Sequence, residues 1–186
     1  MPTSAPDCMS EVCKTIIKLR PRSALDLGAG FGKYGVLLRE YMDHWWGRVE
    51  PQDWEARVDA VEVFPRYVTD LYYTVYSNVY LTDIRSFLAD KARESFTYDL
   101  CYFGDVIEHF PKQEAWEVLG KIPAKYVLVQ TPNFDTNPNR GALHGNEAER
   151  HLSRFYPEDF QRSGAKILCS GRLLLVLVDK EAWKCG

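Results

Sequence analysis

Three acidic residues, Asp26, Glu62 and Asp83, each end a short apolar run of the kind that forms buried β-strands. Ligands of an α/β sheet bind at the carboxyl ends of its parallel strands, so we expect the three carboxylates to face one site. Glu62 is placed to accept both hydroxyls of a ribose. Asp83 and the N–H of Ile84 are placed to bind adenine, and Asp26 to hold an ammonium group. A single acid is also explained as a strand-end cap, but the three together suit an adenosine with an amino-acid tail.

Glycines stand at every second position after the first acid, at Gly28, Gly30 and Gly32. Glycine lets the backbone turn sharply and approach a ligand, and a helix that begins just afterwards offers free N–H groups. These features predict a nucleotide-binding corner. Gly30-x-Gly32-x-x-Gly35 also fits the dinucleotide fingerprint of a nicotinamide-dependent oxidoreductase. Glu62 comes 32 residues after Gly30, however, and the fingerprint places its acid roughly 20 residues on, so this alternative is less favoured.

Strands and helices alternate around these residues. Strands are predicted at 23–27, 57–64, 79–81, 98–103 and 126–130, and helices at 9–19, 33–43, 65–73, 86–93, 113–119 and 157–162. Two further strands, 166–170 and 172–180, read as a closing hairpin. The pattern predicts an α/β fold with a doubly wound, mostly parallel sheet. Residues 1–7 are predicted to be a loose N-terminal tail and 8–186 a single domain.

Composition limits the kinds of partner. The chain has 186 residues, of which 46% are apolar and 26% charged, as in an ordinary soluble globular protein. A net charge of −3 argues against a general nucleic-acid binder. No apolar run approaches the roughly 20 residues of a membrane span, and residues 1–7 lack the features of a secretory signal. We therefore expect a small-molecule partner, no nucleic acid and no membrane.

Five scattered cysteines form no C-x-x-C pair. This predicts neither disulfides nor a thiolate zinc site, and a cytoplasmic location. Cys101 and Cys169 are expected to be small core residues. Three tryptophans, Trp45, Trp46 and Trp54, follow the second helix, at the edge of the sheet opposite the ligand edge. They are expected to cover the core or to form a subunit contact, as in a homodimer.

Together these motifs resemble those of the class I S-adenosylmethionine-dependent methyltransferases, over about residues 20–180. Asp26-x-Gly28-x-Gly30-x-Gly32 is similar to the first motif of the family, Glu62 to its ribose acid, and Asp83-Ile84 to its adenine contact. Tyr98-Asp99-Leu100, leading to Asp105-Val-Ile-Glu-His109, is similar to the fourth strand and the loop after it. The resemblance implies a Rossmann-like seven-stranded sheet in the order 3-2-1-4-5-7-6, with the last-placed strand antiparallel.

The resemblance also implies a function and a site. It implies S-adenosylmethionine as the cofactor and an O or N atom of a small polar or aromatic acceptor, of glycan or secondary-metabolite type, as the methyl acceptor. The cofactor-binding residues that it implies are Asp26, Gly28, Gly30, Gly32, Glu62, Val63, Asp83, Ile84 and Asp105. A catalytically silent cofactor-binding module that works through a partner is the main alternative.

Three histidines, His109, His144 and His151, are the candidate catalytic bases. Methyl transfer from a sulfonium needs alignment and exclusion of water more than acid–base chemistry. A base matters when the acceptor is a weakly acidic hydroxyl or a protonated amine. For His109, capping or packing of the loop after the fourth strand is favoured over catalysis. The polar segment 144–156 is expected to be a lid that faces the acceptor, with a solvated loop as an equal alternative.

Asp105-x-x-Glu108-His109 also resembles the E-x-x-E-H metal-binding segment of two methyltransferase groups. One methylates the 3′-terminal 2′-hydroxyl of small RNAs, and the other belongs to the ubiquinone pathway. With His151 or His144, these side chains could hold a divalent ion that lowers the pKa of an acceptor hydroxyl. Asp105 replaces the first Glu of that motif, so we expect no metal. Metal-assisted O-methylation of a catechol-like or RNA 2′-hydroxyl acceptor remains a minor alternative.

Overall fold

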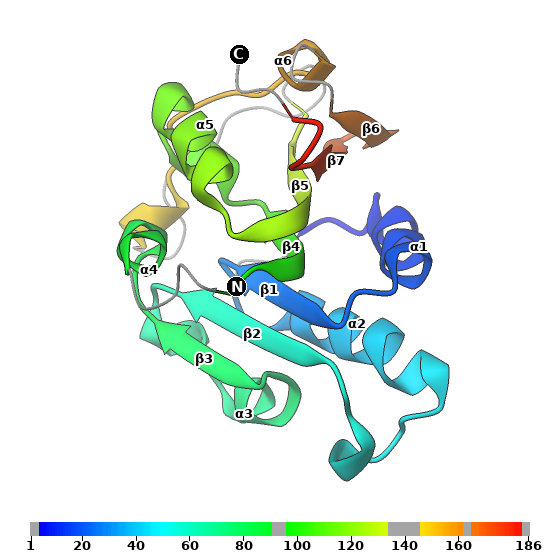
Figure 1. Ribbon diagram of the computed structural model, residues 1–186. Helices are drawn as coiled ribbons and strands as arrows, with labels where there is room; N and C mark the ends of the chain where they lie inside the picture. The colour runs from blue at the N-terminus through cyan, green and yellow to red at the C-terminus, as the bar shows by residue number, and fades with distance from the viewer. Residues whose placement is uncertain (1–3, 91–95, 134–145, 162–164, 184–186) are drawn as a thin grey trace.

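The computed structural model describes residues 4–90, 96–133, 146–161 and 165–183. Seven strands form one sheet in the order β3-β2-β1-β4-β5-β7-β6 (Figure 1). Strands β1 to β5 pair in parallel, and β7 runs antiparallel to both β5 and β6. The strands are β1 (Ser23–Leu27), β2 (Arg57–Glu62), β3 (Asn78–Leu81), β4 (Tyr98–Gly104), β5 (Ala124–Pro132), β6 (Lys166–Ser170) and β7 (Leu173–Asp179). The predicted α/β class, strand order and closing hairpin are confirmed.

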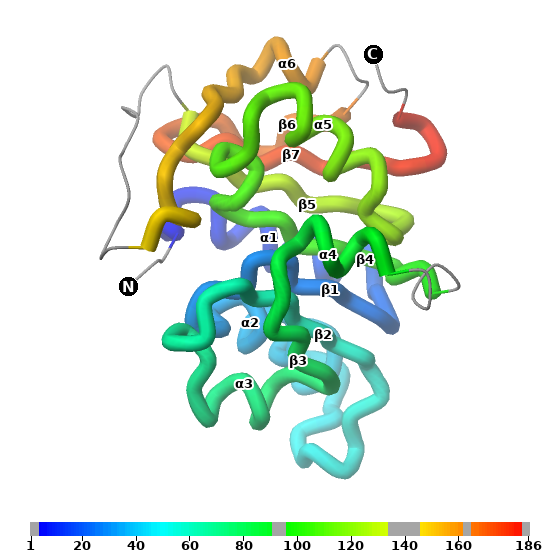
Figure 2. The backbone as a smooth tube through the Cα atoms, turned by 90° about the vertical axis from the view of Figure 1, so that its left-hand side faces the viewer, coloured from blue at the N-terminus to red at the C-terminus, as the bar shows by residue number. Residues whose placement is uncertain are grey.

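Helices cover both faces of the sheet (Figure 1 and Figure 2). One face packs against α1 (Met9–Leu19), α2 (Lys33–Met42) and α3 (Asp70–Val75), and the other against α4 (Ile84–Ala89), α5 (Lys112–Lys121) and α6 (Pro157–Gln161). Short 3-10 turns are η1 (His44–Trp46), η2 (Pro51–Asp53), η3 (Pro65–Tyr67), η5 (Ile107–His109) and η6 (Glu147–Glu149). Across the described ranges, every helix falls short of the length and apolar character needed to cross a bilayer.

The strands read as apolar runs because both faces of the sheet are buried. In β1, Leu25 and Leu27 join the core beneath α4, α5 and α6, and Ala24 joins the core beneath α1, α2 and α3. All three side chains are fully buried. Because successive side chains of a strand are buried on opposite faces of the sheet, polar side chains that could do chemistry are left for the carboxyl ends of the strands.

One predicted helix is broken. The sequence predicts a helix over residues 65–73, whereas the chain forms η3, leaves the helical conformation at Val68 and Thr69, and starts α3 at Asp70. Thr69 is fully extended, with φ −124° and ψ 179°. β-Branched residues such as Val and Thr resist helix formation, so two in succession make a physical break. The break places Tyr67 on the turn after β2 rather than within a long helix.

The cysteine prediction is wrong. Cys8 and Cys169 form a disulfide across 161 residues of sequence, with their Cα atoms 5.9 Å apart. Spacing along the chain could not reveal this pair, because only the tertiary fold brings the start of α1 beside the edge strand β6. The prediction that residues 1–7 form a loose tail also fails for residues 4–7, where Ser4 and Asp7 bond to the body of the protein.

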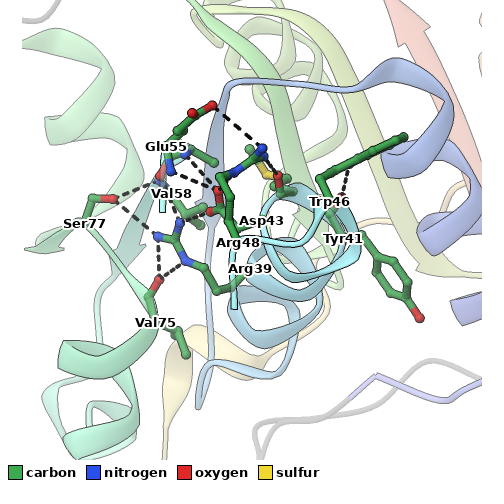
Figure 3. A network of polar contacts seen from close by, with 11 residues as sticks. Arg39, Tyr41, Asp43, Trp46, Arg48, Glu55, Val58, Val75 and Ser77 are labelled. Atoms are coloured by element: carbon green, nitrogen blue, oxygen red, sulfur yellow. Dashed lines mark hydrogen bonds and ion pairs between the residues drawn. The ribbon is translucent and has the colours of Figure 1, made fainter. Parts of the chain in front are cut away.

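A buried carboxylate holds the loop between α2 and β2 (Figure 3). Asp43 is fully buried and accepts hydrogen bonds from Arg39 at 2.5 Å and Arg48 at 2.7 Å. It also accepts from the backbone N–H groups of Glu55 and Ala56. Burial alone would raise the pKa of Asp43, but these four donors outweigh it and lower that pKa.

The same network explains one tryptophan of the loop. The Arg39 guanidinium donates to the carbonyl of Val75 at the end of α3 and lies 4.3 Å from the ring of Trp54. Trp54 therefore covers a buried cation that joins α2 to α3, which is the core-covering role expected for this loop. The loop leads directly into the amino end of β2, away from the carboxyl edge.

Replacing Asp43 with Ala should lower the free energy of unfolding by about 3–5 kcal/mol, because it leaves the buried Arg39 guanidinium without its ion-pair partner. Urea unfolding followed by circular dichroism measures this change. Glu55→Ala is the matched control, since the Glu55 side chain is 79% exposed and lies 3.7 Å from Arg48. The control should cost under about 1 kcal/mol. Equal losses in the two variants would show that the network is not a structural centre.

Candidate functional site

One cavity of about 190 Å³ opens at the carboxyl ends of the parallel strands. It brings together most of the site residues predicted from the sequence. Those that line it are Asp26, Gly28, Gly30, Glu62, Val63, Asp83, Ile84, Asp105 and His109. Gly32 does not line it, because this glycine forms the N-cap of α2, one turn behind the cavity. His144 lies outside the described residues.

The glycine corner places backbone directly against the cavity. Gly28 and Gly30 have φ of 83° and 59°, in the left-handed region that side chains disfavour. A Cβ at Gly28 would lie 2.4 Å from the side chain of Val106. The N–H groups of Gly28 and Ala29 both donate to the carbonyl of Val61, so the corner is fixed to β2. Glycine at position 28 is therefore required by both conformation and space.

Glu62 holds the corner from the other side. Its carboxylate accepts one hydrogen bond from the N–H of Gly30 and one from the N–H of Phe64, each at 2.8 Å. The residue is only 5% exposed. Burial raises the pKa of Glu62 even though these bonds oppose the shift. Each carboxylate oxygen has a second acceptor position, so the side chain can still bind two hydroxyl groups.

Asp83 both lines the cavity and caps a helix. Its carboxylate accepts from the N–H of Arg85 at 2.7 Å and lies 3.2 Å from the Arg85 guanidinium. Asp83 is therefore a helix cap that also lines the cavity, and its contact with adenine stays a prediction. Ile84 is the first residue of α4 and lines the cavity, and the N–H of a first helical residue has no acceptor within its own helix.

Asp26 lies deepest among the three acids. It is 2% exposed and accepts a hydrogen bond of 2.5 Å from the hydroxyl of Tyr76. Burial raises the pKa of Asp26 to about 7, and the nearby charge of Glu62 adds to this shift, while the Tyr76 hydrogen bond opposes it. The Tyr76 ring fits only because residue 35 is glycine, where a Cβ would lie 2.2 Å from the ring. Gly35 is therefore required for the packing of the Tyr76 ring beside Asp26.

Tyr102, which the sequence did not single out, completes the cavity beside Tyr34. Tyr34 and Tyr102 line it and stack with their ring centres 3.8 Å apart. The Tyr34 hydroxyl donates to Gln130, whose amide lies 3.5 Å from Asp105. Tyr102 reads as an ordinary core residue of β4, so local sequence gave no signal for its place in the site.

The expected lid contacts the Glu62 side of the cavity. Asn146, Ala148 and Glu149 line the cavity beside Tyr67, which follows β2. The Tyr67 hydroxyl lies 3.3 Å from the Glu149 carboxylate and 3.4 Å from the Asn146 amide. This part of segment 144–156 therefore covers the end of the cavity where we predicted ribose, rather than facing the acceptor alone.

Two histidines and a carboxylate gather beside the cavity. Atoms of Glu108, His109 and His151 that could bind a metal all lie within 4.8 Å of one another, and we call these residues the histidine cluster. Asp105 was the fourth candidate ligand, and it is not in the metal-ligand group found among the described residues. Glu108 is fully buried and accepts from the hydroxyl of Thr131 at 2.9 Å.

The ring of His109 is held between two backbone carbonyls. Its nitrogens lie 3.0 Å from the carbonyl oxygens of Arg150 and Asp105. Both carbonyls are acceptors and a neutral imidazole donates from one nitrogen only, so in that form the second nitrogen faces a carbonyl oxygen without a proton between them. His109 is therefore oriented by the lid on one side and by the loop after β4 on the other.

The strand order and the cavity at the carboxyl edge are those of a Rossmann-like seven-stranded fold, as the family resemblance implied. The chain is similar to the N-terminal domain of EvdMO1, whose crystal structure was determined in the presence of S-adenosylhomocysteine and D-fucose. The TM-score is 0.63 at 12% identity, over 95% of this chain and 84% of that one. No protein-family model matches this chain, and no curated protein matches its sequence.

Two further solved structures have the same fold. The methyltransferase domain of bacterial CtHen1-C gives a TM-score of 0.60 at 16% identity, over 92% of this chain and 95% of that one. An O-methyltransferase family protein from Burkholderia thailandensis gives 0.55 at 15% identity, over 92% of this chain and 55% of that one. At such identities the similarity establishes the fold alone, so the site itself must supply the case for a function.

Asp26 makes stability depend on pH. The pKa of Asp26 in the folded chain is about 7, whereas the ordinary value of an Asp side chain is 3.8. Asp26 therefore stabilises the fold fully below the unfolded pKa, and this contribution is lost as pH rises through 7. Between about pH 5 and pH 7.5, the unfolding free energy of the wild type should fall by about 2–3 kcal/mol relative to Asp26→Asn.

Urea unfolding of both proteins at the two pH values measures this difference. Asparagine keeps the size of the side chain and an oxygen that can accept from the Tyr76 hydroxyl, so it removes only the titration. A difference between wild type and variant that stays constant with pH would contradict the assignment.

Proposed function

We propose that this protein is an S-adenosylmethionine-dependent methyltransferase that methylates an O or N atom of a small polar or aromatic acceptor. One observation carries the proposal. Asp26, Glu62 and Asp83 end three adjacent parallel strands and line a single cavity with Gly28 and Gly30. Three acids in that order beside a glycine corner match an adenosine that carries an amino-acid tail better than they match a dinucleotide.

Each acid has a separate role in this proposal. Glu62 accepts the two ribose hydroxyls on the acceptor positions that Gly30 and Phe64 leave open. Asp83 accepts from the adenine amine, and the N–H of Ile84 donates to a ring nitrogen. Asp26 attracts the ammonium group of the methionine end, which restores the charge that burial disfavours.

S-adenosylmethionine supplies a methyl group that is already activated when it is bound. The protein then has to align the acceptor and exclude water. The stacked rings of Tyr34 and Tyr102 present a flat apolar surface, and Val106 closes the cavity beside Gly28. His109 lines the same cavity, and we assign to it the role of accepting a proton from an acceptor hydroxyl, which requires its ring to leave one of the two carbonyls that hold it.

A hydroxyl of a sugar-like molecule is the acceptor class that we favour. The N-terminal domain of EvdMO1 shares the fold and was crystallised in the presence of D-fucose. The net charge of −3 gives no general attraction to a nucleic-acid backbone. The end of the cavity near His109 is polar enough to bind a hydroxyl, because Asp105 also lines it.

Titration with S-adenosylhomocysteine and with NAD tests the cofactor. The wild type should bind the homocysteine compound, and Glu62→Ala and Asp83→Ala should each weaken that binding by about 1–3 kcal/mol. Glu117→Ala, on the exposed face of α5, is the control and should bind as the wild type does. Isothermal titration calorimetry gives all of these affinities.

The other outcomes separate the alternatives. Binding of NAD without a response to S-adenosylhomocysteine would identify an oxidoreductase. Binding of S-adenosylhomocysteine without turnover on a panel of sugar, phenol and amine acceptors would favour the silent module. Equal affinity in the wild type and both variants would overturn the assignment of Glu62 and Asp83.

Metal-assisted methylation of a hydroxyl is the second candidate, and the histidine cluster favours it. Two imidazoles and one carboxylate, with ligand atoms within 4.8 Å of one another, are a suitable donor set for a divalent transition metal. Glu108, His109 and His151 would hold the ion, which lowers the pKa of a bound hydroxyl.

Titration with Mn²⁺ distinguishes the two candidates. If the cluster holds a metal, the wild type should bind Mn²⁺, and Glu108→Gln and His151→Ala should each weaken binding by at least about tenfold. His44→Ala, in η1 at the far end of α2, should change nothing. An absence of Mn²⁺ binding in the wild type would leave His109 acting without a metal.

A further inference from the structure

Residues 4–7, which we call the N-terminal segment, are fastened to the closing hairpin. Cys8, directly after the segment, is bonded to Cys169 in β6. Asp7 forms an ion pair of 3.0 Å with Arg172, in the turn between β6 and β7. Both attachments join the start of the chain to the same hairpin at the edge of the sheet.

The other end of the segment forms part of the cavity. Ser4 lines the cavity together with Lys33 and Tyr34. The Lys33 ammonium donates to the carbonyl of Ser4 at 2.9 Å and lies 5.4 Å from the centre of the Tyr34 ring. Lys33 is the first residue of α2, immediately after the glycine corner. The position of Ser4 therefore affects the residues that begin the helix beside the corner.

We propose that the Cys8–Cys169 disulfide is a redox control of this cavity. The oxidised pair holds the N-terminal segment against Lys33 and Tyr34, and reduction releases the segment and opens that side of the cavity. The proposal rests on the proposed function only in naming S-adenosylmethionine and S-adenosylhomocysteine as the ligands that respond. The oxidised protein is the form that binds them more tightly.

The disulfide is the strongest of the attachments. The Asp7–Arg172 pair is exposed, with 56% of the Arg172 side chain accessible, and such pairs contribute little. At the other end of the segment, Ser4 is held by hydrogen bonds to Lys33 and Tyr34 beside the cavity. Helix α1 stays docked in the reduced protein through Val12 and Ile16, which are buried in the core. Reduction is therefore expected to act locally, on the segment and the first turn of α1.

The two sulfurs differ in access. Cys8 is fully buried, whereas Cys169 lies half-buried in the edge strand β6. In oxidation by a small disulfide such as glutathione disulfide, the Cys169 thiolate attacks one sulfur and releases one glutathione thiolate. The Cys8 thiolate then attacks the Cys169 sulfur and releases the second. Two electrons pass from the cysteines to glutathione disulfide, and the two thiol protons go to the two glutathione thiolates.

The test compares the full chain after oxidation by glutathione disulfide and after reduction by dithiothreitol. Calorimetry should show that S-adenosylhomocysteine binds about three- to tenfold more tightly to the oxidised form, because its site is preorganised. Hydrogen exchange should be faster in the reduced form at residues 5–8 and at Lys33. The Cys8→Ser/Cys169→Ser double variant should resemble the reduced form under both conditions. Cys13→Ser keeps the pair and should respond as the wild type does, since Cys13 is a free cysteine of the same helix.

Three results would overturn the proposal. They are a failure of glutathione disulfide to join Cys8 to Cys169, equal affinity together with equal exchange in the two forms, and a response to dithiothreitol in the double variant. If neither form binds S-adenosylhomocysteine, the proposed function fails instead. The exchange rates at residues 5–8 and Lys33 then decide alone whether the disulfide controls the cavity.

Discussion

The cavity depends on two carboxylates that share a desolvated space. Glu62 accepts hydrogen bonds from two backbone N–H groups, which tie the glycine turn to the end of β2. Among the side chains of the described residues, Asp26 accepts a hydrogen bond only from Tyr76. Burial and the charge of Glu62 together raise the pKa of Asp26 to about 7. A cationic group placed between these acids would stabilise both as anions. A cationic ligand beside Asp26 and Glu62 would therefore lower the pKa of both carboxyl groups, which is the role that we propose for the ammonium of the cofactor.

The features that sequence predicted well are those that neighbouring residues determine. Apolar runs bounded by turn residues located all seven strands, and the glycines located the start of α2 at Lys33. The acids at strand ends converge because every parallel strand presents its carboxyl end at the same edge. The strand order itself came from the family resemblance, since no local pattern states which strand lies next to which. One prediction from the local pattern was wrong: the helix expected over 65–73 is broken by the two β-branched residues Val68 and Thr69.

The features that sequence missed are contacts between distant segments. Cys8 meets Cys169 across 161 residues, and Tyr67 meets Glu149 across 82. Nothing in the residues around either partner identifies the other, so spacing rules for cysteines gave the wrong expectation. Tyr102 was missed for the same reason. An aromatic residue in a buried strand has the same local sequence pattern whether its ring packs in the core or lines a cavity.

The two kinds of contact produce two kinds of cavity surface. Strand ends and the glycine corner are fixed by the sheet, so the residues proposed to read adenosine cannot move independently. Ser4 and the residues around Glu149 reach the cavity from loops, and each is held there by few side-chain bonds. Such loops open at lower free-energy cost than the sheet. Ligand exchange is therefore expected to depend on these two segments, while recognition of the adenosine remains with the strand ends.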